Sequence, residues 1–600
     1  MIDKGSCSFV QKSGPLPKRV LHSKQKFIII YYGRKWHIVA LIQGVGIMNR
    51  KLSLFFSLLV LCSAPCVTLA APLANVDSGV QLRQVQEQIE RERIEQQMQE
   101  QREKQKENIE DRQQKPSGQA GKVQFVLKSV ETDDSKILPP AKKDEIVAPY
   151  VGKNVTLDDL YAITEKINRF YQDNGWITCC AYLPPQTIHD GHVRIAVIEG
   201  KTGDVTVTGN RHTRASYIKG RLGIRPGGIE NTKSLDRRIQ RAVATDDLAL
   251  NVTLKAGREP KTTDYEIVVA EPKNQGFTLY MDGAGNESTG RWRAGAFYSN
   301  RSLFKIRDRL SLGYLHSKGM DSFSAGYSVP LGYNGARFAL DYNTNSTEVV
   351  KGIYHDQGIP VKGRASSVMA TLTQPLHVTE KVKVEALLSG NYQHSKTDIA
   401  GAQLINDTFK DITAGLSVTN YGKQWALYQK HSVMFGNWDN DAITTATAGR
   451  SSHYTIYNFL GLYQYAGKAG QLFNFRASAQ WSGSDNLRPS RQFFLGGVYS
   501  VRGYEENTIG GDSGFCVSAE YAVPVTKDRV LSLYEFVDYG SLFGEDKPRN
   551  HTLLGVGAGI RARFKNIAYL DLAVGFPLKR KLDGDRAGRT RVHLSASVTF

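Results

Sequence analysis

The chain has 600 residues, of which 41% are hydrophobic, and its formal net charge at pH 7 is +19. This length is too great for one compact domain, so two or more domains are expected. The first 70 residues hold ten Lys and Arg side chains against one acidic residue, so the rest of the chain carries a net charge of only about +10. An excess this small, with no recognition motif beside it, does not indicate binding to nucleic acid.

The stretch MNRKLSLFFSLLVLCSAPCVTLAAP has the pattern of a secretory signal peptide. Arg50 and Lys51 form a positive n-region, an apolar core follows, and small residues precede a cleavage point before Ala71. The apolar core is too short to cross a membrane as a helix. We therefore expect a signal peptide over residues 48–70. Residues 1–47 would then come from a mis-assigned start codon or from an extended N-terminus.

Residues 77–116 consist almost entirely of Gln, Glu, Arg and Lys, and no Gly or Pro occurs between Val80 and Lys115. These residue types favour a helix, and apolar positions along it are sparse. A helix that is polar all round either stays in water or lies in a wet cavity. The segment is therefore expected to be a solvated, partly disordered linker or a helix in an aqueous lumen.

Two small α/β modules are expected over residues 121–200 and 201–272, each with the element order β-α-α-β-β. In the first, Thr156 begins a capping box, T-x-x-D, before a helix expected from Leu157 to about Asp173. Further along this module a Pro-Pro turn joins two strands, and its residues are Leu183, Pro184, Pro185 and Gln186.

Residues with reactive side chains do not form a recognisable site in these modules. The histidines are isolated, the cysteines lack metal-ligand spacing, and no paired acid and base or activated nucleophile stands out. The sequence therefore predicts neither an enzyme nor a metal or cofactor site.

Residues 276–600 repeat strand patterns of about ten residues in which apolar and polar side chains alternate, as in the final RVHLSASVTF, which ends at Phe600. The polar faces are too charged for a protein core, which favours apolar faces toward lipid and polar faces toward a water-filled lumen. In hydrocarbon every backbone group must be paired, so the sheet must close. We count about sixteen strands and predict a 16-stranded antiparallel transmembrane β-barrel, wide enough for a channel or a plug.

A glycine-rich stretch between two late strands, GGVYSVRGYEENTIGG, carries an arginine among apolar and aromatic neighbours, which an ordinary surface loop does not need. A guanidinium is a fixed planar cation that is suited to bidentate pairing with a carboxylate. The central residues of this stretch are Val501, Arg502, Gly503 and Tyr504.

A candidate partner for this arginine lies on the strand after next, in the stretch FVDYG, with Phe536, Asp538 and Gly540. Strand alternation places Phe536 and Asp538 together on the face assigned to the lumen. Glu535 then falls on the lipid side, which is unfavourable unless it lies at the membrane interface or on a bulge.

The order of these parts resembles that of the two-partner secretion transporters, the TpsB family (haemolysin-activator or ShlB–FhaC-like, with CdiB-like members), which are related to the barrel-assembly protein BamA. The resemblance extends from the signal peptide to Phe600, and its most specific motifs are VRGY and F-x-D-x-G. It implies that Arg502 reaches Asp538 inside the barrel and anchors the inserted loop, and that Phe600 is the C-terminal barrel signal. It also implies that the modules are periplasmic POTRA domains, the first carrying LPPQ in its usual pattern, and that the polar helix is a plug.

The function implied by this resemblance is type V, two-partner secretion across the outer membrane of a Gram-negative bacterium. The chain would recognise a TpsA-type exoprotein (a haemolysin, adhesin or contact-dependent toxin) in the periplasm and secrete it through the barrel pore. Expected partners are that exoprotein, outer-membrane lipid and the barrel-assembly machinery, with no nucleic acid. The alternatives are an insertase that assembles other barrels and a diffusion porin.

Overall fold

The computed structural model describes residues 26–32, 35–41, 75–104, 124–440, 452–545, 547–564, 567–582 and 586–600. The expected signal peptide lies outside these residues, as does the polar segment beyond Lys104. The chain divides into two units, Met1–Cys66 and Val67–Phe600. In the first unit, strands β1 (Lys26–Tyr32) and β2 (Lys35–Leu41) pair in an antiparallel manner.

The polar segment forms one long helix, α3 (Ser78–Lys104), which precedes the first α/β module in the chain. The Asp77 carboxylate accepts a hydrogen bond from the Gly79 amide (2.7 Å), so it satisfies one of the free N–H groups at the helix start. Beyond Gly79 the helix contains only good or moderate helix formers. In the described part of the chain, no helix is long and apolar enough to cross a membrane.

The first module contains a small three-stranded sheet in the order β4-β7-β6 and a separate pair of strands, β3 and β5. Strand β7 pairs with β4 in parallel and with β6 in an antiparallel manner. The elements are β3 (Gln124–Val126), β4 (Ser129–Thr132), α4 (Pro140–Val147), β5 (Asn154–Thr156), α5 (Leu157–Asp173), β6 (Cys179–Tyr182) and β7 (His192–Glu199).

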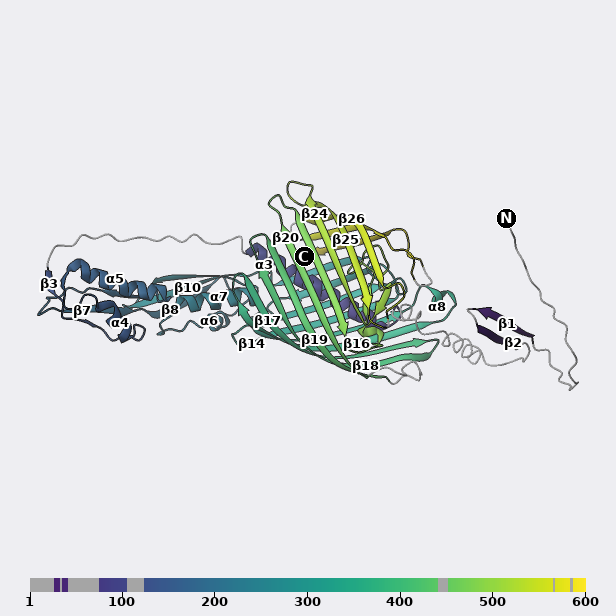
Figure 1. Cartoon of the computed structure of the whole chain (residues 1–600), viewed down its shortest axis with the longest axis horizontal. Coiled ribbons are helices and arrows are strands. Elements are labelled where there is room, and N and C mark those ends of the chain that lie inside the picture. The colour runs from purple at the N-terminus through teal and green to yellow at the C-terminus, as the bar shows by residue number, and fades with distance from the viewer. Residues whose placement is uncertain are drawn as a thin grey trace, which may run out of the picture. The chain divides into compact units, whose positions relative to one another are not determined.

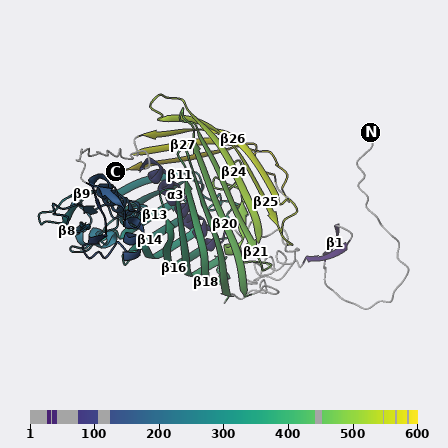
Figure 2. The ribbon, with the colours of Figure 1, turned by 60° about the vertical axis from the view of Figure 1, so that its left-hand side comes forward.

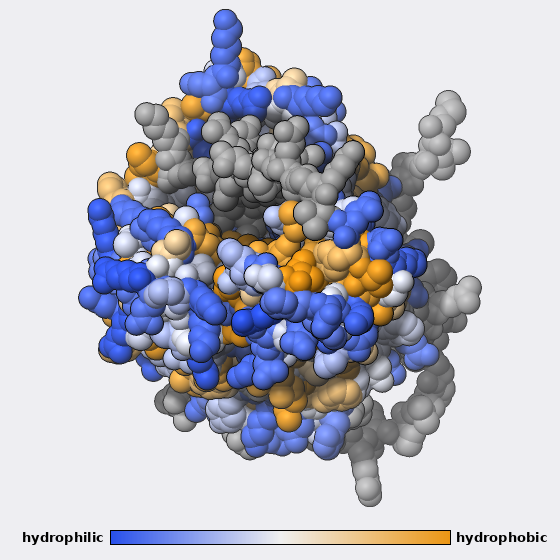
Figure 3. All heavy atoms as spheres, turned by 90° about the vertical axis from the view of Figure 1, so that its left-hand side faces the viewer, coloured by the Kyte–Doolittle hydropathy of each residue, from blue (hydrophilic) through white to orange (hydrophobic). Residues whose placement is uncertain are grey.

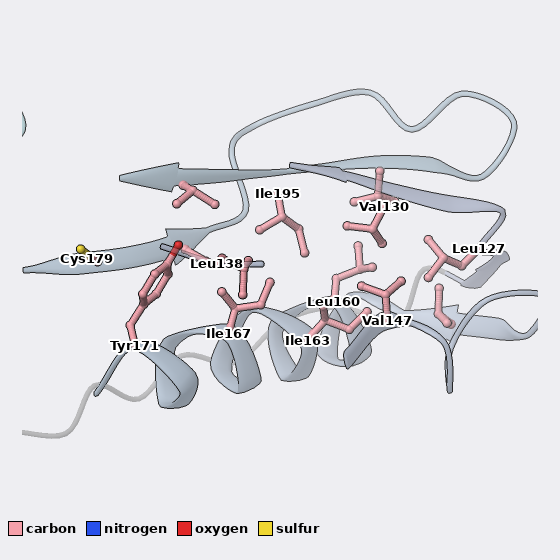
Figure 4. Close-up of a cluster of buried hydrophobic side chains, with 14 residues drawn as sticks. Leu127, Val130, Leu138, Val147, Leu160, Ile163, Ile167, Tyr171, Cys179 and Ile195 are labelled. Atoms are coloured by element: carbon pink, nitrogen blue, oxygen red, sulfur yellow. The ribbon is translucent and has the colours of Figure 1, made fainter. Parts of the chain in front are cut away.

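Helix α5 organises the core of this module. Its predicted capping box is present, since Asp159 N donates to Thr156 Oγ1 and Thr156 N donates to the Asp159 carboxylate. One face of α5 then points Leu160, Ile163 and Ile167 at the sheet, where all three are fully buried (Figure 4). Burying one such side chain stabilises a fold by about 1.5–3 kcal/mol, so this face fixes the helix on the sheet.

The second module has the expected order β-α-α-β-β, and its sheet is ordered β8-β10-β9. Helix α7 starts where the Asn231 side chain accepts a hydrogen bond from Ser234 N (3.0 Å), and its apolar face packs on the sheet. The elements are β8 (Lys201–Thr208), α6 (Ala215–Leu222), α7 (Thr232–Asp246), β9 (Ala249–Ala256) and β10 (Thr262–Ala270).

Sixteen antiparallel strands of the described residues close a barrel, which confirms the predicted fold class. The ring closes where the last strand pairs with the first. The strands are β11 (Gln275–Asp282), β12 (Arg293–Asn300), β13 (Arg309–Ser317), β14 (Met320–Leu331), β15 (Ala336–Glu348), β16 (Val361–Val378), β17 (Val382–Ile399), β18 (Ala402–Tyr421), β19 (Trp425–Asn440), β20 (His453–Ala466), β21 (Leu472–Ser482), β24 (Ser513–Pro524), β25 (Leu531–Phe543), β26 (Thr552–Phe564), β27 (Ala568–Pro577) and β28 (Arg591–Thr599).

Side chains along the barrel strands alternate between the outer surface and the lumen, as predicted. In β25, Leu533 and Val537 are exposed on the outer surface, whereas Phe536 and Asp538 are buried inside. Glu535 lies on the outer face near the start of β25, and β25 pairs with both neighbours without a register shift, so this residue does not sit on a bulge. Strands β16, β17 and β18 have 18, 18 and 20 residues, more than the about 9–11 that span a bilayer, so they extend past the membrane.

Inside the barrel lies α3, around which the strands run obliquely (Figures 1 and 2). The second module attaches to the turns at one barrel end, since Ser302 Oγ in the β12–β13 turn donates to His212 O (2.7 Å). The start of α3 contacts Asn345 of β15 and Lys396 of β17, which lie at the barrel end away from the second module. The helix then runs along the lumen toward the end that carries this module.

Candidate functional site

The connection between β21 and β24 folds back into the barrel lumen instead of projecting outward. It contains a single 3-10 turn, η2 (Pro489–Arg491), and a short pair of strands, β22 (Phe493–Leu495) and β23 (Ile509–Gly511). We call residues 483–512 the inserted segment. Four apolar residues of the segment, Leu495, Val501, Tyr504 and Ile509, pack against Cys516 of β24, Leu542 of β25 and Leu553 of β26.

Arg502 of the inserted segment is held by Asp538 of β25. Its Nε donates to Asp538 Oδ2 (2.7 Å) and its Nη2 donates to Oδ1 (2.8 Å), a bidentate pair in which both side chains are buried. The backbone N–H of Arg502 adds a third bond to Oδ2 (3.0 Å). The guanidinium carbon also lies 3.5 Å from the centre of the Phe536 ring, within the range of a cation–π contact. The two motifs singled out in the sequence thus meet in one place.

Glu520 of β24 is a second carboxylate at Arg502, and sequence reasoning missed it. Arg502 Nη1 donates to Glu520 Oε2 (3.1 Å), and Arg561 Nη1 donates to Oε1 (2.7 Å). A third guanidinium, that of Arg476, lies 3.8 Å from Oε2. Alternation places Glu520 on the lumen side, but no local pattern tells which side chain it meets across the lumen.

The remaining residues of the two motifs let the segment lie close to the wall. Gly503 has φ of +96°, a conformation that L side chains rarely adopt. The Tyr504 hydroxyl is within hydrogen-bonding distance of the carbonyl oxygens of Leu554 (3.0 Å) and Lys579 (2.9 Å). At Gly540, an added Cβ would lie 2.6 Å from the Leu495 side chain of the segment, so a larger residue would force Leu495 to shift.

Helix α3 is bound to several sides of the lumen by polar side chains. The contacts reach strands far apart around the barrel, which places the helix across the lumen and not against one wall. They are Gln86 to Ser367 of β16 (2.7 Å), Gln88 to Tyr280 of β11 (3.0 Å), Lys430 of β19 to Glu90 (2.5 Å) and Arg83 to Gln480 of β21 (3.2 Å). Apolar contacts are limited to small clusters, such as Ile94 and Met98 against Ala426 and Leu462.

The helix also bonds directly to the inserted segment. Gln84 Nε2 donates to Asn507 Oδ1 (2.6 Å), and Arg91 Nη1 donates to the Tyr499 carbonyl oxygen (2.5 Å). The Tyr499 hydroxyl in turn donates to Glu92 (3.3 Å). Helix and segment therefore occupy the lumen together and are joined by hydrogen bonds that water could replace.

The outer edge of β6 in the first module is covered at one residue by the neighbouring helix. Asn168 of α5 donates to Ala181 O (2.9 Å) and accepts from Ala181 N (2.6 Å), which satisfies both backbone groups. The LPPQ stretch follows β6 directly. There Gln186 exchanges two hydrogen bonds with the backbone of Arg194 on β7 (2.7 and 2.8 Å), and prolines without N–H groups precede it.

Hydrophilic side chains cover most of the face that Figure 3 shows, and apolar side chains reach the surface between them. Arg194 forms an ion pair with Asp133 (2.7 Å), and this partner holds the pKa of the Asp133 carboxyl below its ordinary value. The exposed large apolar side chains of the first module are Val126, Val151, Tyr161, Ile177 and Tyr182.

Phe600 closes the barrel seam. Its N–H donates to Phe277 O (2.8 Å), and the two rings lie 6.4 Å apart between centroids on the outer surface. Among the described residues no group of His, Cys, Asp or Glu is arranged to hold a metal ion. The described residues thus offer polar contacts in the lumen and an edge strand, β6, on the first module.

Two family models match the chain. The model described as haemolysin secretion/activation protein ShlB/FhaC/HecB matches residues 262–562, half of the chain. The model of the POTRA domain, ShlB-type, matches residues 125–200.

Curated relatives and solved structures agree with these models. The chain is 26% identical to the heme/hemopexin transporter protein HuxB of Haemophilus influenzae over 76% of this chain and 83% of the relative. It is 21% identical to the outer membrane transporter CdiB of Dickeya dadantii over the same shares. The structure of CdiB from Escherichia coli superposes with a TM-score of 0.64 at 19% identity, covering 82% of this chain and 93% of that chain, which shows a shared fold.

Proposed function

The chain belongs to the ShlB/FhaC/HecB family of haemolysin secretion/activation proteins, and we propose that α3 and the inserted segment together gate its pore for one exported partner protein. As a member of this family it is an outer-membrane translocator of two-partner secretion, with POTRA modules on the periplasmic side. The single observation that carries the gating proposal is the polar filling of the lumen. A permanent core would be apolar, whereas α3 meets the wall mainly through exchangeable hydrogen bonds.

The first module is proposed to capture the exoprotein while it is extended. An extended chain can add to an exposed sheet edge, where backbone hydrogen bonds supply affinity for many sequences. The outer edge of β6 offers such a site next to exposed apolar side chains, which include Tyr182. Asn168 covers Ala181 on that edge, so an incoming strand must displace an amide side chain there.

The exoprotein itself is proposed to be a large surface or secreted protein of the haemolysin, adhesin or contact-dependent toxin kind. Relatives carry the names heme/hemopexin transporter protein HuxB and outer membrane transporter CdiB, so the proposal keeps all three kinds of exoprotein. Further proposed partners are the lipid around the barrel's apolar outer face and the barrel-assembly machinery that inserts it. Neither catalysis nor nucleic acid has a part in this proposal, and folding of the exoprotein outside the cell would drive its movement.

The test compares the full chain with a chain that lacks residues 124–200. Each is co-expressed with candidate exoproteins from the same genome, beginning with the neighbouring gene. We expect export to stop although the barrel still inserts and stays heat-modifiable on gels. Export at an unchanged level would disprove capture by the first module. Loss of other outer-membrane barrels on depletion of the full chain would instead indicate an insertase.

A further inference from the structure

A second anchor of the inserted segment lies on β18, five strands away from the Arg502 site around the barrel. It is formed by Leu487–Gln492, which we call the clasp. In this stretch both Arg488 and Arg491 are buried, and each forms an ion pair with a buried aspartate of β18, Asp407 and Asp411 respectively. The clasp precedes the VRGY motif in the chain and shares no residue with it.

The Arg491 contact repeats the geometry of the Arg502 site. Its Nη2 donates to Asp411 Oδ2 (2.6 Å), and its guanidinium carbon lies 4.1 Å from the centre of the Phe409 ring. Phe409 and Asp411 are two residues apart on one face of a strand, as are Phe536 and Asp538 at the first anchor. Both sites therefore place an arginine between an aromatic ring and a carboxylate in an F-x-D arrangement.

Arg488 forms a bidentate pair with Asp407, which lies four residues before Asp411 on β18. Its Nε and Nη2 donate to the two Asp407 carboxylate oxygens at 2.6 and 3.0 Å. The guanidinium carbon lies 5.1 Å from the Trp438 ring centre, which again places it against an aromatic side chain. Charge-assisted, bidentate bonds of this kind are about twice as strong as neutral ones, so the clasp is firmly fixed to the wall.

The start of α3 rests on this clasp. Ser490 Oγ donates to Asp77 Oδ2 (3.3 Å), and Arg83 Nη1 lies 3.3 Å from Ser490 O and 3.1 Å from Gln492 O. Asp77 also accepts from Ser395 Oγ on β17 (3.2 Å). These contacts are longer than those between the clasp and β18.

We propose that the clasp is a positioning device that holds the outer end of α3 in the closed pore, and that Arg488 and Arg491 with Asp407 and Asp411 set how easily that end is released. The inference rests on the proposed plug role of α3. The clasp stays on β18 when the helix leaves, because its charged pairs are stronger than its contacts with the helix. Weakening the charged pairs moves Ser490 and the carbonyl groups that receive the helix, so the helix detaches more often.

The experiment measures access to the helix start in intact cells. A reporter cysteine replaces Ser78, which is buried at the start of α3, and a membrane-impermeant maleimide is added outside. Arg491→Gln and Asp411→Asn are each combined with this reporter. We expect labelling to accelerate about tenfold, the size expected when a hydrogen bond to a charged group is lost. The matched control is Lys410→Gln on the same strand, whose exposed pair with Asp439 (3.6 Å) does not touch the clasp.

Two further arms keep the inference separate from its premise. The first arm is the swap of Arg491→Asp with Asp411→Arg, which should return labelling toward the reference rate. A general loss of stability would not be reversed by this swap. Heat-modifiability on gels checks that each barrel folds. Labelling unchanged in both single variants, or raised equally by Lys410→Gln, would overturn the clasp. If deletion of residues 78–104 leaves pore conductance unchanged, the plug role fails, whatever the labelling shows.

Discussion

Arg502 of the inserted segment contacts two carboxylates at once. Asp538 takes two of its side-chain donors and Glu520 takes a third. Arg561 and Arg476 form ion pairs with Glu520 as well. Removal of Asp538 therefore leaves Arg502 one carboxylate, whereas removal of Arg502 deprives Asp538 of its bidentate partner.

This asymmetry predicts the order of export defects. Arg502→Ala should reduce export most, and Asp538→Ala should reduce it less. The double variant should be no worse than Arg502→Ala, because both changes remove the same shared interaction. Breaking a buried pair costs about 3–5 kcal/mol, less in a wet lumen, so the barrel should still insert. Arg502→Lys should behave like Arg502→Ala because an ammonium lacks the planar fork.

The measurement is secreted exoprotein normalised to heat-modifiable barrel in the outer membrane. Fully additive defects in the double variant would show that Arg502 and Asp538 act separately. An export level in Asp538→Ala below that of Arg502→Ala would contradict a role of Glu520 in holding Arg502.

The sequence contains enough information for the Arg502 site but not for the clasp. VRGY and F-x-D-x-G are recognisable motifs, and alternation places Asp538 in the lumen, where the structure has it. The role of this pair in anchoring the segment stays a prediction. Phe409 and Asp411 also form F-x-D, yet strand alternation does not say which of sixteen lumen faces an irregular segment will touch. Such long-range contacts depend on the path that the inserted segment takes across the lumen, and this path is not encoded in a local sequence pattern.

At the scale of elements, α3 shows how composition predicts a helix without placing it. Its Gln, Glu, Arg and Lys content favours a helix both in solution and in a wet lumen. The lumen is distinguished from solution by a set of hydrogen-bonding and charged partners on β11, β16, β19 and β21, which no local sequence pattern predicts.

Deletion of residues 78–104 should enlarge single-channel conductance in planar bilayers, since the helix crosses the lumen and is bound on several sides. The inserted segment should stay in place, because its two anchors on β18 and β25 do not include the helix. Conductance should therefore rise without reaching that of an empty barrel, which a second deletion of residues 487–509 would provide. Conductance equal to that of the intact chain, in a barrel that assembles normally, would remove the plug role from α3.

The β6 edge of the first module leads to a prediction about affinity. Asn168→Ala should lower the stability of the module by about 1–3 kcal/mol, because the Ala181 N–H and C=O lose their partner. The same change should tighten binding of an exoprotein segment up to about tenfold, since an added strand would satisfy both groups.

The test is a binding titration with the full chain in detergent, with Asn174→Ala as the control. Asn174 belongs to the same module and bonds to the end of α5 through Phe170 O (2.8 Å), away from the edge. Reduced stability together with unchanged affinity would place the docking site elsewhere than the β6 edge.

At the scale of the whole molecule, we expect the joint between the second module and the barrel to affect how a captured segment reaches the pore. Helix α7 ends at Asp246 and is followed by Asp247, and two arginines, Arg307 before β13 and Arg309 at its start, contact these residues. Arg307 Nε donates to Asp246 O (2.8 Å), and Arg309 Nη2 donates to Asp247 Oδ2 (2.8 Å). Cations are favourable at a helix C-terminus because its carbonyl groups carry partial negative charge.

Asp246→Asn should loosen this joint without unfolding either part. Asp246 is paired with Arg221 (Nε to Oδ2 2.6 Å), and both side chains are almost completely buried. The change leaves the buried guanidinium without its counter-charge, at a cost of up to about 3–5 kcal/mol. The Arg221 guanidinium also bonds to Tyr333 O in the β14–β15 turn, so its displacement would weaken the contact with the barrel. We expect faster proteolytic cleavage between Ala270 and Gln275 and reduced export, with unchanged heat-modifiability. Asp236→Asn, an exposed position on the same helix, should change neither. Equal cleavage rates in the two variants would show that the Arg221–Asp246 pair stabilises the module alone and does not hold it on the barrel.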